Sequence, residues 1–241
     1  MIDFHCHILP GLDDGAVDQH EALSMARILA TYGFREIICT PHCLTGSYDN
    51  SPERVVEDIE KLQHLLKENG IPLTLFAGME YHLDEFFYLE LDHLQPLGET
   101  SLVLAEIPTQ GSEELVLEGL QAILDKGMTP LLAHPERSFL LSQGAPWFKR
   151  LWRRAFPFNV TDEGDFSGTL LNRMREMGCL FQGNIGSFCG HYGQEVQRQA
   201  LCYLQTGLYD HWGSDGHHPA SLEKILSRGL PRLNEQKRAV G

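Results

Sequence analysis

Six short hydrophobic runs in this chain each end at a histidine or a glutamate. They cover residues 2–7 (IDFHCH), 36–42 (EIICTPH), 72–80 (PLTLFAGME), 102–106 (LVLAE), 130–134 (PLLAH) and 208–217 (LYDHWGSDGH). A buried parallel strand reads as a short apolar run, and the strands of a β/α barrel open at their carboxyl ends onto one shared face. The pattern therefore predicts a ring of ionisable side chains around the mouth of a barrel.

Segments with helical spacing separate these runs. Residues 18–32, 51–70 and 112–126 each combine a capping residue, a one-sided apolar pattern and a glycine or asparagine stop, and 168–177 and 194–204 supply further helices. A seventh run, 179–184 (CLFQGN), ends in amides. Seven strand-like runs that alternate with helices predict an α/β fold, a distorted (β/α)7 TIM-like barrel. We expect one domain over 1–241, because a division within the irregular segment 138–165 would split the ionisable ring.

Composition and charge narrow the functional class. A content of 42% hydrophobic and 22% charged residues over 241 positions predicts a globular protein with a sizeable core. The net charge of −14 opposes nucleic-acid binding, which depends on lysine and arginine at phosphates. The chain opens with no signal peptide, and no apolar run is long enough to span a bilayer, so we expect a cytoplasmic protein that is not membrane-embedded.

The six cysteines are predicted to be free thiols, because none forms a C-x-x-C pair and most lie in apolar runs. Phosphatases that use a cysteine nucleophile need an arginine six positions after that cysteine. Asp49 holds that position after Cys43, and Leu12 holds it after Cys6. The sequence therefore excludes this kind of cysteine catalysis.

His5 and His7 are two positions apart on a predicted strand, so both side chains project from one face while Cys6 points away. Two imidazoles at a strand end suit a divalent metal. The turn 11–15 (GLDDG) follows, and it can bring Asp14 back to the same point. For Asp13 we prefer a role in forming the turn.

The other runs complete a set of nine candidate metal ligands. They are His5, His7, Asp14, His42, Glu80, Glu106, His134, Asp215 and His217. Nine ligands exceed the needs of one ion and suit two or three. Imidazole and carboxylate donors without thiolate favour manganese, iron or zinc over a structural zinc site. Such ions attract a phosphate dianion and lower the pKa of bound water.

Arg137 follows the ligand His134 by three residues, and its guanidinium can grip two phosphate oxygens at once. A surface ion pair with Glu136 is the alternative for this side chain. Asn184 and Gln182 are candidates for orienting a substrate or a ligand. Other histidines, His82 among them, fall outside the strand-end pattern and are given no role.

Several segments, taken in order, match a known signature. They are MIDFHCHILPGLDDG at 1–15, TPH at 40–42, GME at 78–80, AHPER at 133–137, GNIGS at 183–187 and GSDGH at 213–217. With these segments the chain resembles the PHP (polymerase and histidinol phosphatase) superfamily. Within it, the resemblance is to the bacterial manganese-dependent protein-tyrosine phosphatases of capsule and exopolysaccharide gene clusters. The segments span nearly the whole chain, and their combination is more specific than H-x-H alone.

The resemblance implies a PHP-type barrel in which the nine ligands hold three metal ions, with Mn²⁺ as the expected cofactor. It also implies hydrolysis of phosphotyrosine on a protein, typically the tail of a tyrosine autokinase that regulates polysaccharide export. Arg137, Asp215 and His217 are the expected catalytic residues. Arg137 would stabilise the phosphoryl oxygens, and His217 or a water would protonate the phenolate, whose pKa is about 10.

The chain departs from this family in two places. Family members carry an arginine shortly after the S-D-x-H motif, whereas the nearest arginines here are Arg228 and Arg232. The segment 138–165 is longer than usual and is expected to form a lid or an interaction surface. Two alternatives stay open: a PHP phosphoesterase for a small molecule such as histidinol phosphate, and a non-catalytic module that binds a kinase or a phosphopeptide.

Overall fold

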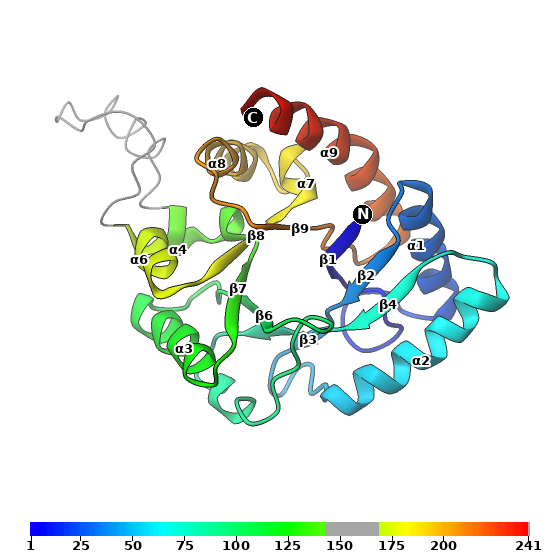
Figure 1. Ribbon diagram of the computed structural model, residues 1–241, viewed down its shortest axis with the longest axis horizontal. Coiled ribbons are helices and arrows are strands. Elements are labelled where there is room, and N and C mark those ends of the chain that lie inside the picture. The colour runs from blue at the N-terminus through cyan, green and yellow to red at the C-terminus, as the bar shows by residue number, and fades with distance from the viewer. Residues whose placement is uncertain (143–168, 241) are drawn as a thin grey trace.

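The computed structural model describes residues 1–142 and 169–240, and its strands curl into a distorted barrel (Figure 1). The strands are β1 (Ile2–Cys6), β2 (Glu36–Cys39), β3 (His42–Cys43), β4 (Thr74–Ala77), β5 (Glu80–His82), β6 (Leu102–Glu106), β7 (Thr129–Ala133), β8 (Leu180–Asn184) and β9 (His211–Gly213). Every pairing between them is parallel. All seven predicted runs are therefore strands.

Two of the seven runs are each divided in two. β3 follows β2 after a break at Thr40 and Pro41, and β5 follows β4 after a break at Gly78 and Met79. The sheet orders are β1-β2-β4 and β3-β5-β6-β7-β8-β9. The ring closes where the Cys6 backbone meets that of Gly216 beyond β9. The predicted distorted (β/α)7 TIM-like barrel is confirmed.

Helices cover the outside of the ring (Figure 1). They are α1 (Gln19–Thr31), α2 (Pro52–Glu68), α3 (Glu113–Asp125), α4 (Phe139–Ser142), α6 (Leu170–Met177), α7 (Ile185–Phe188), α8 (Gln194–Gln205) and α9 (Pro219–Val240), with 3-10 turns η1 (Phe87–Leu89) and η2 (Pro135–Arg137). Ser51 and Ser112 accept the backbone N–H three residues on, so both predicted caps are confirmed. Among the described residues, no helix has the length and hydropathy needed to cross a membrane.

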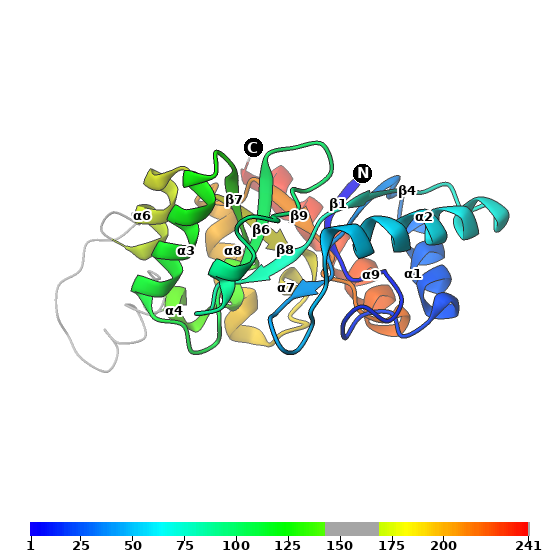
Figure 2. The ribbon, with the colours of Figure 1, turned by 90° about the horizontal axis from the view of Figure 1, so that it is seen from below.

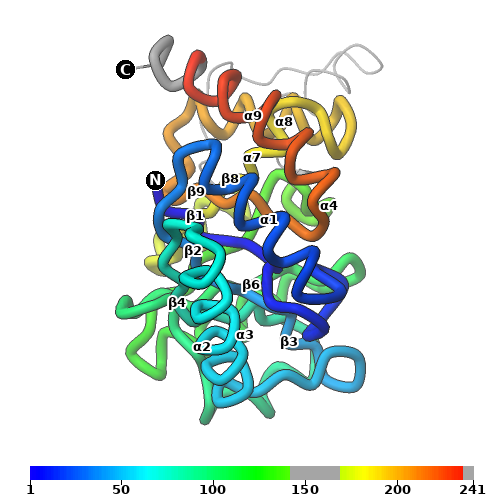
Figure 3. The backbone as a smooth tube through the Cα atoms, turned by 90° about the vertical axis from the view of Figure 1, so that its right-hand side faces the viewer, coloured from blue at the N-terminus to red at the C-terminus, as the bar shows by residue number. Residues whose placement is uncertain are grey.

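Helix α9 has no counterpart in the sequence-based expectations. Pro231 lies inside it and removes a backbone donor, which normally marks a helix boundary. The helix nevertheless continues, because Leu230 just before the proline and Leu233 just after it are buried in the main core. Figure 3 shows α9 lying beside α1, so the first and last long helices pack against each other. Most of segment 138–165, the expected lid, lies outside the described residues.

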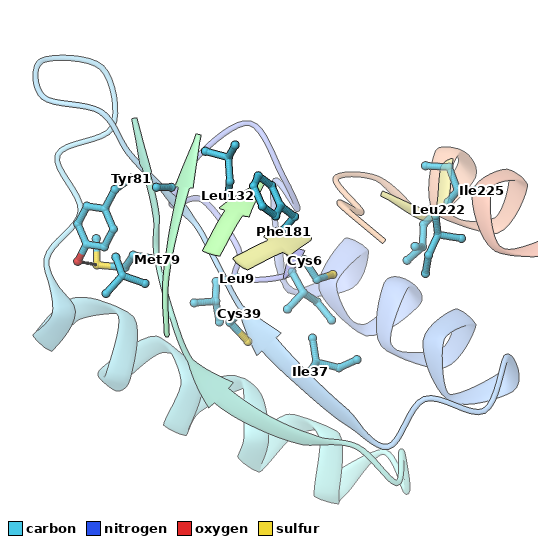
Figure 4. Packing of buried hydrophobic residues seen from close by; sticks show 14 of the residues in the cluster. Cys6, Leu9, Ile37, Cys39, Met79, Tyr81, Leu132, Phe181, Leu222 and Ile225 are labelled. Carbon is cyan, nitrogen blue, oxygen red and sulfur yellow. Dashed lines mark hydrogen bonds between the residues drawn. The ribbon is translucent and has the colours of Figure 1, made fainter. Parts of the chain in front are cut away.

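Two apolar clusters alternate along the strands. On β6, Val103 and Ala105 belong to the large cluster, which also includes the helix residues Met25 and Leu120. Figure 4 shows part of this cluster, with Cys6, Ile37 and Cys39 among its members. Leu102 and Leu104, on the alternate positions of β6, belong to a smaller cluster. Glu106 continues that second face, so apolar residues fill the barrel interior and polar residues follow at its mouth.

β1 is irregular at its centre. Its register with β2 shifts between Asp3 and Cys6, which is the mark of an extra residue in one strand. Cys6 joins the outer core, whereas His5 and His7 place their Nε2 atoms 2.9 Å apart. The predicted common face for these two histidines is confirmed. Figure 2 shows that the loops after β1 and β3 lie on the same side of the ring as α7.

Candidate active site

The strand ends bring the predicted metal ligands together around one point. Four overlapping sets have one ligand atom per residue, all within 4.8 Å of one another. They are His7–Asp14–His42–His217, His5–His7–Asp215, His5–Glu80–His134 and His42–Glu80–Glu106. These sets contain all nine predicted ligands and no other residue. The barrel mouth therefore holds a dense nitrogen and oxygen donor set.

Glu80 lies at the centre of this set. Its Oε2 atom is 3.1 Å from His5 Nε2, 3.1 Å from His42 Nδ1 and 3.3 Å from His7 Nε2. The carboxylate is buried, yet Oε2 accepts no hydrogen bond from any of these nitrogens. A buried carboxylate oxygen without a hydrogen bond is costly unless a cation compensates it. The arrangement fits divalent metal ions held between Glu80 and the histidines.

Three of the histidines have their Nδ1 atoms held by protein oxygens. His5 Nδ1 is 3.0 Å from Gln182 Oε1, and His217 Nδ1 is 3.0 Å from the Asp215 carbonyl. His7 Nδ1 is 2.7 Å from Asp13 Oδ2. An acceptor at Nδ1 leaves the lone pair on Nε2, which is how neutral histidines are prepared for metals. Gln182 thus orients His5, one of the predicted ligands.

Two glycines allow the close packing around β1. A Cβ on Gly213 would lie 2.4 Å from His5 Cβ, and a Cβ on Gly15 would lie 2.2 Å from the His7 carbonyl oxygen. Real Cβ atoms do not approach other atoms so closely. Glycine at the end of β9 therefore lets that strand pack directly against His5, and glycine in the GLDDG turn lets the turn pack directly against His7.

Two of the predicted ligands have a left-handed backbone. His134 has φ 29° and Asp215 has φ 52°, and in the described part of the chain no other non-glycine residue has positive φ. Such conformations cost of order 1–3 kcal/mol each and persist where the surroundings enforce them. Simple alternation along β7 would turn His134 away from the barrel mouth, since Ala133 belongs to the inner cluster. The unusual backbone instead brings His134 Nε2 to 3.1 Å from Glu80 Oε1.

Asp14 and Glu106 lie at the rim. Asp14 Oδ1 is 3.5 Å from His42 Nε2 and 3.5 Å from His217 Nε2, so the turn does bring this aspartate back as predicted. Glu106 Oε1 is 3.7 Å from His134 Nε2. These groups line a cavity of about 220 Å³, which is large enough for a phosphoryl group.

Arg137 reaches this cavity from η2. Its Nη1 donates to Asp215 Oδ2, and its guanidinium carbon lies 4.5 Å from the centre of the Tyr192 ring. The alternative partner Glu136 is instead buried, where its Oε1 accepts from Ser187 Oγ at 2.7 Å. The alternative of a surface ion pair between Arg137 and Glu136 is therefore wrong.

The charges at the mouth reinforce one another. Burial raises the pKa of Glu80, but the charges of His5 and His42 outweigh burial and hold that pKa well below its usual range. Burial lowers the pKa of His7, but hydrogen bonds to Asp13 and neighbouring carboxylates raise it well above its usual value. The Glu80 carboxylate therefore stays ionised near neutral pH, and the carboxylates around His7 favour positive charge beside them.

Three residues that were not predicted to belong to the site contact its members. Asp13 forms the expected turn by accepting from Gly15, but it also holds His7. His82 Nδ1 is 3.2 Å from Glu106 Oε2 and lines the cavity. Glu80 and His82 are two positions apart on β5, as His5 and His7 are near β1. The same alternation could therefore have identified His82 as a residue of the site. Tyr192 contacts both Arg137 and Asp215, and no sequence pattern indicated it.

The aromatic loop residue Tyr48 also lines the cavity, and its ring stacks on His42 with 5.7 Å between ring centres. All six cysteines are unpaired, as predicted. Burial raises the pKa of Cys43 to about 12, so this thiol is a poor nucleophile near neutral pH.

Comparison with known proteins agrees with this geometry. Tyrosine-protein phosphatase YwqE from Bacillus subtilis is 30% identical over 222 residues, which cover 90% of this chain and 78% of the relative. Tyrosine-protein phosphatase CpsB from Streptococcus pneumoniae is 31% identical over 139 residues, 57% of each chain. A crystal structure from work on these two proteins, described there as metal-dependent tyrosine phosphatases, superposes with a TM-score of 0.73 and 28% identity. The match covers 99% of this chain and 94% of that one.

The family model described as "Capsular polysaccharide synthesis, CpsB/CapC" matches residues 1–162, which include seven of the nine clustered ligands. The structural match extends the similarity across the remaining strands and helices. The chain therefore belongs to the CpsB/CapC family of capsular polysaccharide synthesis proteins.

Proposed function

We propose that this chain is a metal-dependent phosphatase that hydrolyses phosphotyrosine in a protein substrate. The observation that carries the proposal is the clustering of five histidines and four carboxylates at one point, beside a cavity that has a guanidinium at its edge. The names of the relatives from B. subtilis and S. pneumoniae support phosphotyrosine as the substrate class.

Two or three Mn²⁺ ions are the proposed cofactor. The proposed ligands are His5, His7, Asp14, His42, Glu80, Glu106, His134, Asp215 and His217. Imidazole and carboxylate donors without thiolate suit manganese, and they also suit iron and zinc. The orphaned Glu80 Oε2 supports a cation at the centre of the set.

Divalent ions, when bound, supply Lewis acidity and an activated water near neutral pH. Arg137 is proposed to donate two hydrogen bonds to phosphoryl oxygens, and its pair with Asp215 keeps the guanidinium beside the cavity. His217 is the proposed proton donor to the leaving phenolate. A phenolate with a pKa of about 10 needs less help in leaving than an alkoxide.

A second cavity of about 130 Å³ supports an aryl substrate. It shares Glu106, His134 and Arg137 with the first cavity. The rest of its lining includes the apolar residues Ile107, Pro108 and Phe139. We propose that the phenyl ring of phosphotyrosine enters this second cavity while its phosphoryl group occupies the first.

The proposed partner is a bacterial tyrosine autokinase whose phosphorylated tail controls capsule or exopolysaccharide synthesis, and the description of the family supports this context. The six unpaired cysteines support a cytoplasmic location. We also propose that 1–241 form a single domain, because Arg137 and Asp215 pair across the segment where a boundary would fall.

The test combines metal analysis of protein purified without chelator with assays of three phosphoesters. We expect two to three metals per chain and manganese-dependent turnover of a phosphotyrosine peptide and of p-nitrophenyl phosphate. His42→Ala should abolish this turnover. His64→Ala is the matched control, because His64 is exposed and pairs only with Glu68 among the described residues.

Preference for histidinol phosphate over the phosphopeptide would move the function to small-molecule metabolism. Protein that binds metal but turns over no phosphoester would be a binding module. Protein that neither binds metal nor becomes active after manganese addition would overturn the proposal altogether.

A further inference from the structure

Tyr192 lies in the loop between α7 and α8, where it contacts two residues from neighbouring loops. Its ring lies beneath the guanidinium of Arg137, and its hydroxyl is 3.3 Å from Asp215 Oδ2. We infer that Tyr192 is a positioning residue that holds both the phosphate-binding arginine and one metal ligand. This inference rests on the proposed function of the same site.

The ring acts on Arg137. The guanidinium carbon is 4.5 Å from the ring centre, within the range of an attractive cation–π contact. The Arg137 side chain is 31% exposed, so it depends on its neighbours to stay in one orientation. The Tyr192 ring is itself packed edge-on against the His191 ring, with 4.8 Å between ring centres, and closely against Gly186, where a Cβ would lie only 3.0 Å from Cε2. The ring is therefore a fixed platform for the guanidinium.

The hydroxyl acts on Asp215. Asp215 Oδ2 accepts hydrogen bonds from Arg137 Nη1, from Asn184 Nδ2 at 2.8 Å and from the Tyr192 hydroxyl. Three donors on one oxygen leave Oδ2 no capacity for a metal. The other oxygen, Oδ1, is 3.4 Å from His5 Nε2 and 3.4 Å from His7 Nε2. Asp215 is thus arranged to bind a metal through Oδ1 alone.

The Tyr192 hydroxyl and ring therefore have separable effects. The hydroxyl fixes which oxygen of Asp215 faces the metals, so its loss should weaken metal binding. The ring fixes Arg137, so its loss should weaken binding of the phosphoryl group. A residue that only filled space would affect neither without also lowering the stability of the metal-free protein.

Two variants separate these effects. Tyr192→Phe keeps the ring and should weaken Mn²⁺ binding by about 10-fold, the usual size for an outer-shell partner, with little change in phosphate affinity. Tyr192→Leu should also raise the dissociation constant of inorganic phosphate by about 3- to 30-fold, the loss expected for a cation–π contact. Titration calorimetry measures both constants without turnover. The phosphate titrations are run at saturating Mn²⁺.

Tyr32→Phe is the matched control. The Tyr32 hydroxyl also donates to a carboxylate, Glu223 Oε1 at 2.7 Å, but it lies on the surface away from the site. Thermal unfolding of the metal-free proteins shows whether each variant is folded. The KM of the peptide substrate should rise in Tyr192→Leu and stay unchanged in Tyr192→Phe at saturating Mn²⁺.

Wild-type metal affinity in Tyr192→Phe together with wild-type phosphate affinity in Tyr192→Leu would overturn the inference. Weaker binding that only follows a lower unfolding temperature of the metal-free protein would also overturn it, because it would indicate a packing role. Failure of the wild-type protein to cleave phosphotyrosine would instead reject the proposed function, and the binding constants would still test Tyr192.

Discussion

His7 Nδ1 donates to Asp13 Oδ2 across 2.7 Å, and the same oxygen accepts the backbone N–H of His42 at 2.9 Å. Asp13 thereby joins β1 to β3 directly beneath two proposed metal ligands. An ionised carboxylate can accept hydrogen bonds but cannot donate them. The proton therefore stays on His7 Nδ1, and Nε2 is the nitrogen that can offer its lone pair to a metal. The turn residue thus decides which nitrogen a metal meets.

Replacing Asp13 should therefore weaken metal binding. We expect Asp13→Ala to lower the affinity for Mn²⁺ by about 10- to 100-fold, the range for outer-shell partners of histidine ligands. Calorimetric titration with Mn²⁺ measures the change. Asp84→Ala is the matched control, because Asp84 also accepts from the backbone N–H two residues on, but within 1–142 and 169–240 no hydrogen bond or ion pair joins its side chain to a proposed ligand. An equal loss of Mn²⁺ affinity in both variants would mean that Asp13 acts only by forming the turn.

Arg137 should act on phosphoryl transfer when the metal sites are saturated. We expect Arg137→Ala to reduce kcat/KM at saturating Mn²⁺ by about 10²- to 10³-fold, as for loss of one charge-stabilising donor. Arg137→Lys should recover little of the activity, because an ammonium cannot form the two parallel hydrogen bonds of a guanidinium. Recovery of most of the activity in the lysine variant would argue against the two-bond grip.

Thiol reagents and chelators should have opposite effects on activity. Burial raises the pKa of Cys43 and that of Cys179 to about 12, so neither forms much thiolate near neutral pH. We expect activity to survive iodoacetamide and to be lost with EDTA, then to return on addition of Mn²⁺. Residual activity is measured with p-nitrophenyl phosphate. Inactivation by iodoacetamide that substrate prevents would contradict a metal mechanism.

Asp3 should make stability depend on pH. Burial raises its pKa from 3.8 to about 6, because Oδ2 has no hydrogen-bond donor, although His5 N and Ser214 N donate to Oδ1. The folded protein holds this proton more tightly than the unfolded chain, so the contribution to stability is present at low pH and is lost as pH rises through about 6. From pH 5 to 7.5 the loss is about 1–2 kcal/mol.

Asp3→Asn removes this titration. We expect the free energy of unfolding of the metal-free variant, minus that of the wild type, to rise by the same amount over that interval. Urea unfolding at the two pH values measures both free energies, and the subtraction cancels the titration of groups that do not interact with Asp3. A difference that does not change with pH would mean that Asp3 stays ionised throughout.

Local sequence patterns were sufficient to predict most of the strands and helices. The seven strands follow from short apolar runs, and the capped helices at α1, α2 and α3 follow from spacing and terminal residues. Helix α9 was missed because Pro231 is a local break signal that tertiary burial overrides. The apolar runs likewise did not predict that β2 and β3, or β4 and β5, are separate strands.

The sequence by itself determined which side chains meet at the barrel mouth, since parallel strands deliver their carboxyl ends to one face whatever their detailed geometry. Only the tertiary structure decided how those side chains are held. The left-handed backbone of His134 brings its ring to Glu80, Asp13 holds the backbone of His42, and Tyr192 lies under Arg137, so each arrangement depends on a neighbour from a distant segment. Side-chain orientation depends on such neighbours, and one-dimensional periodicity carries no information about them.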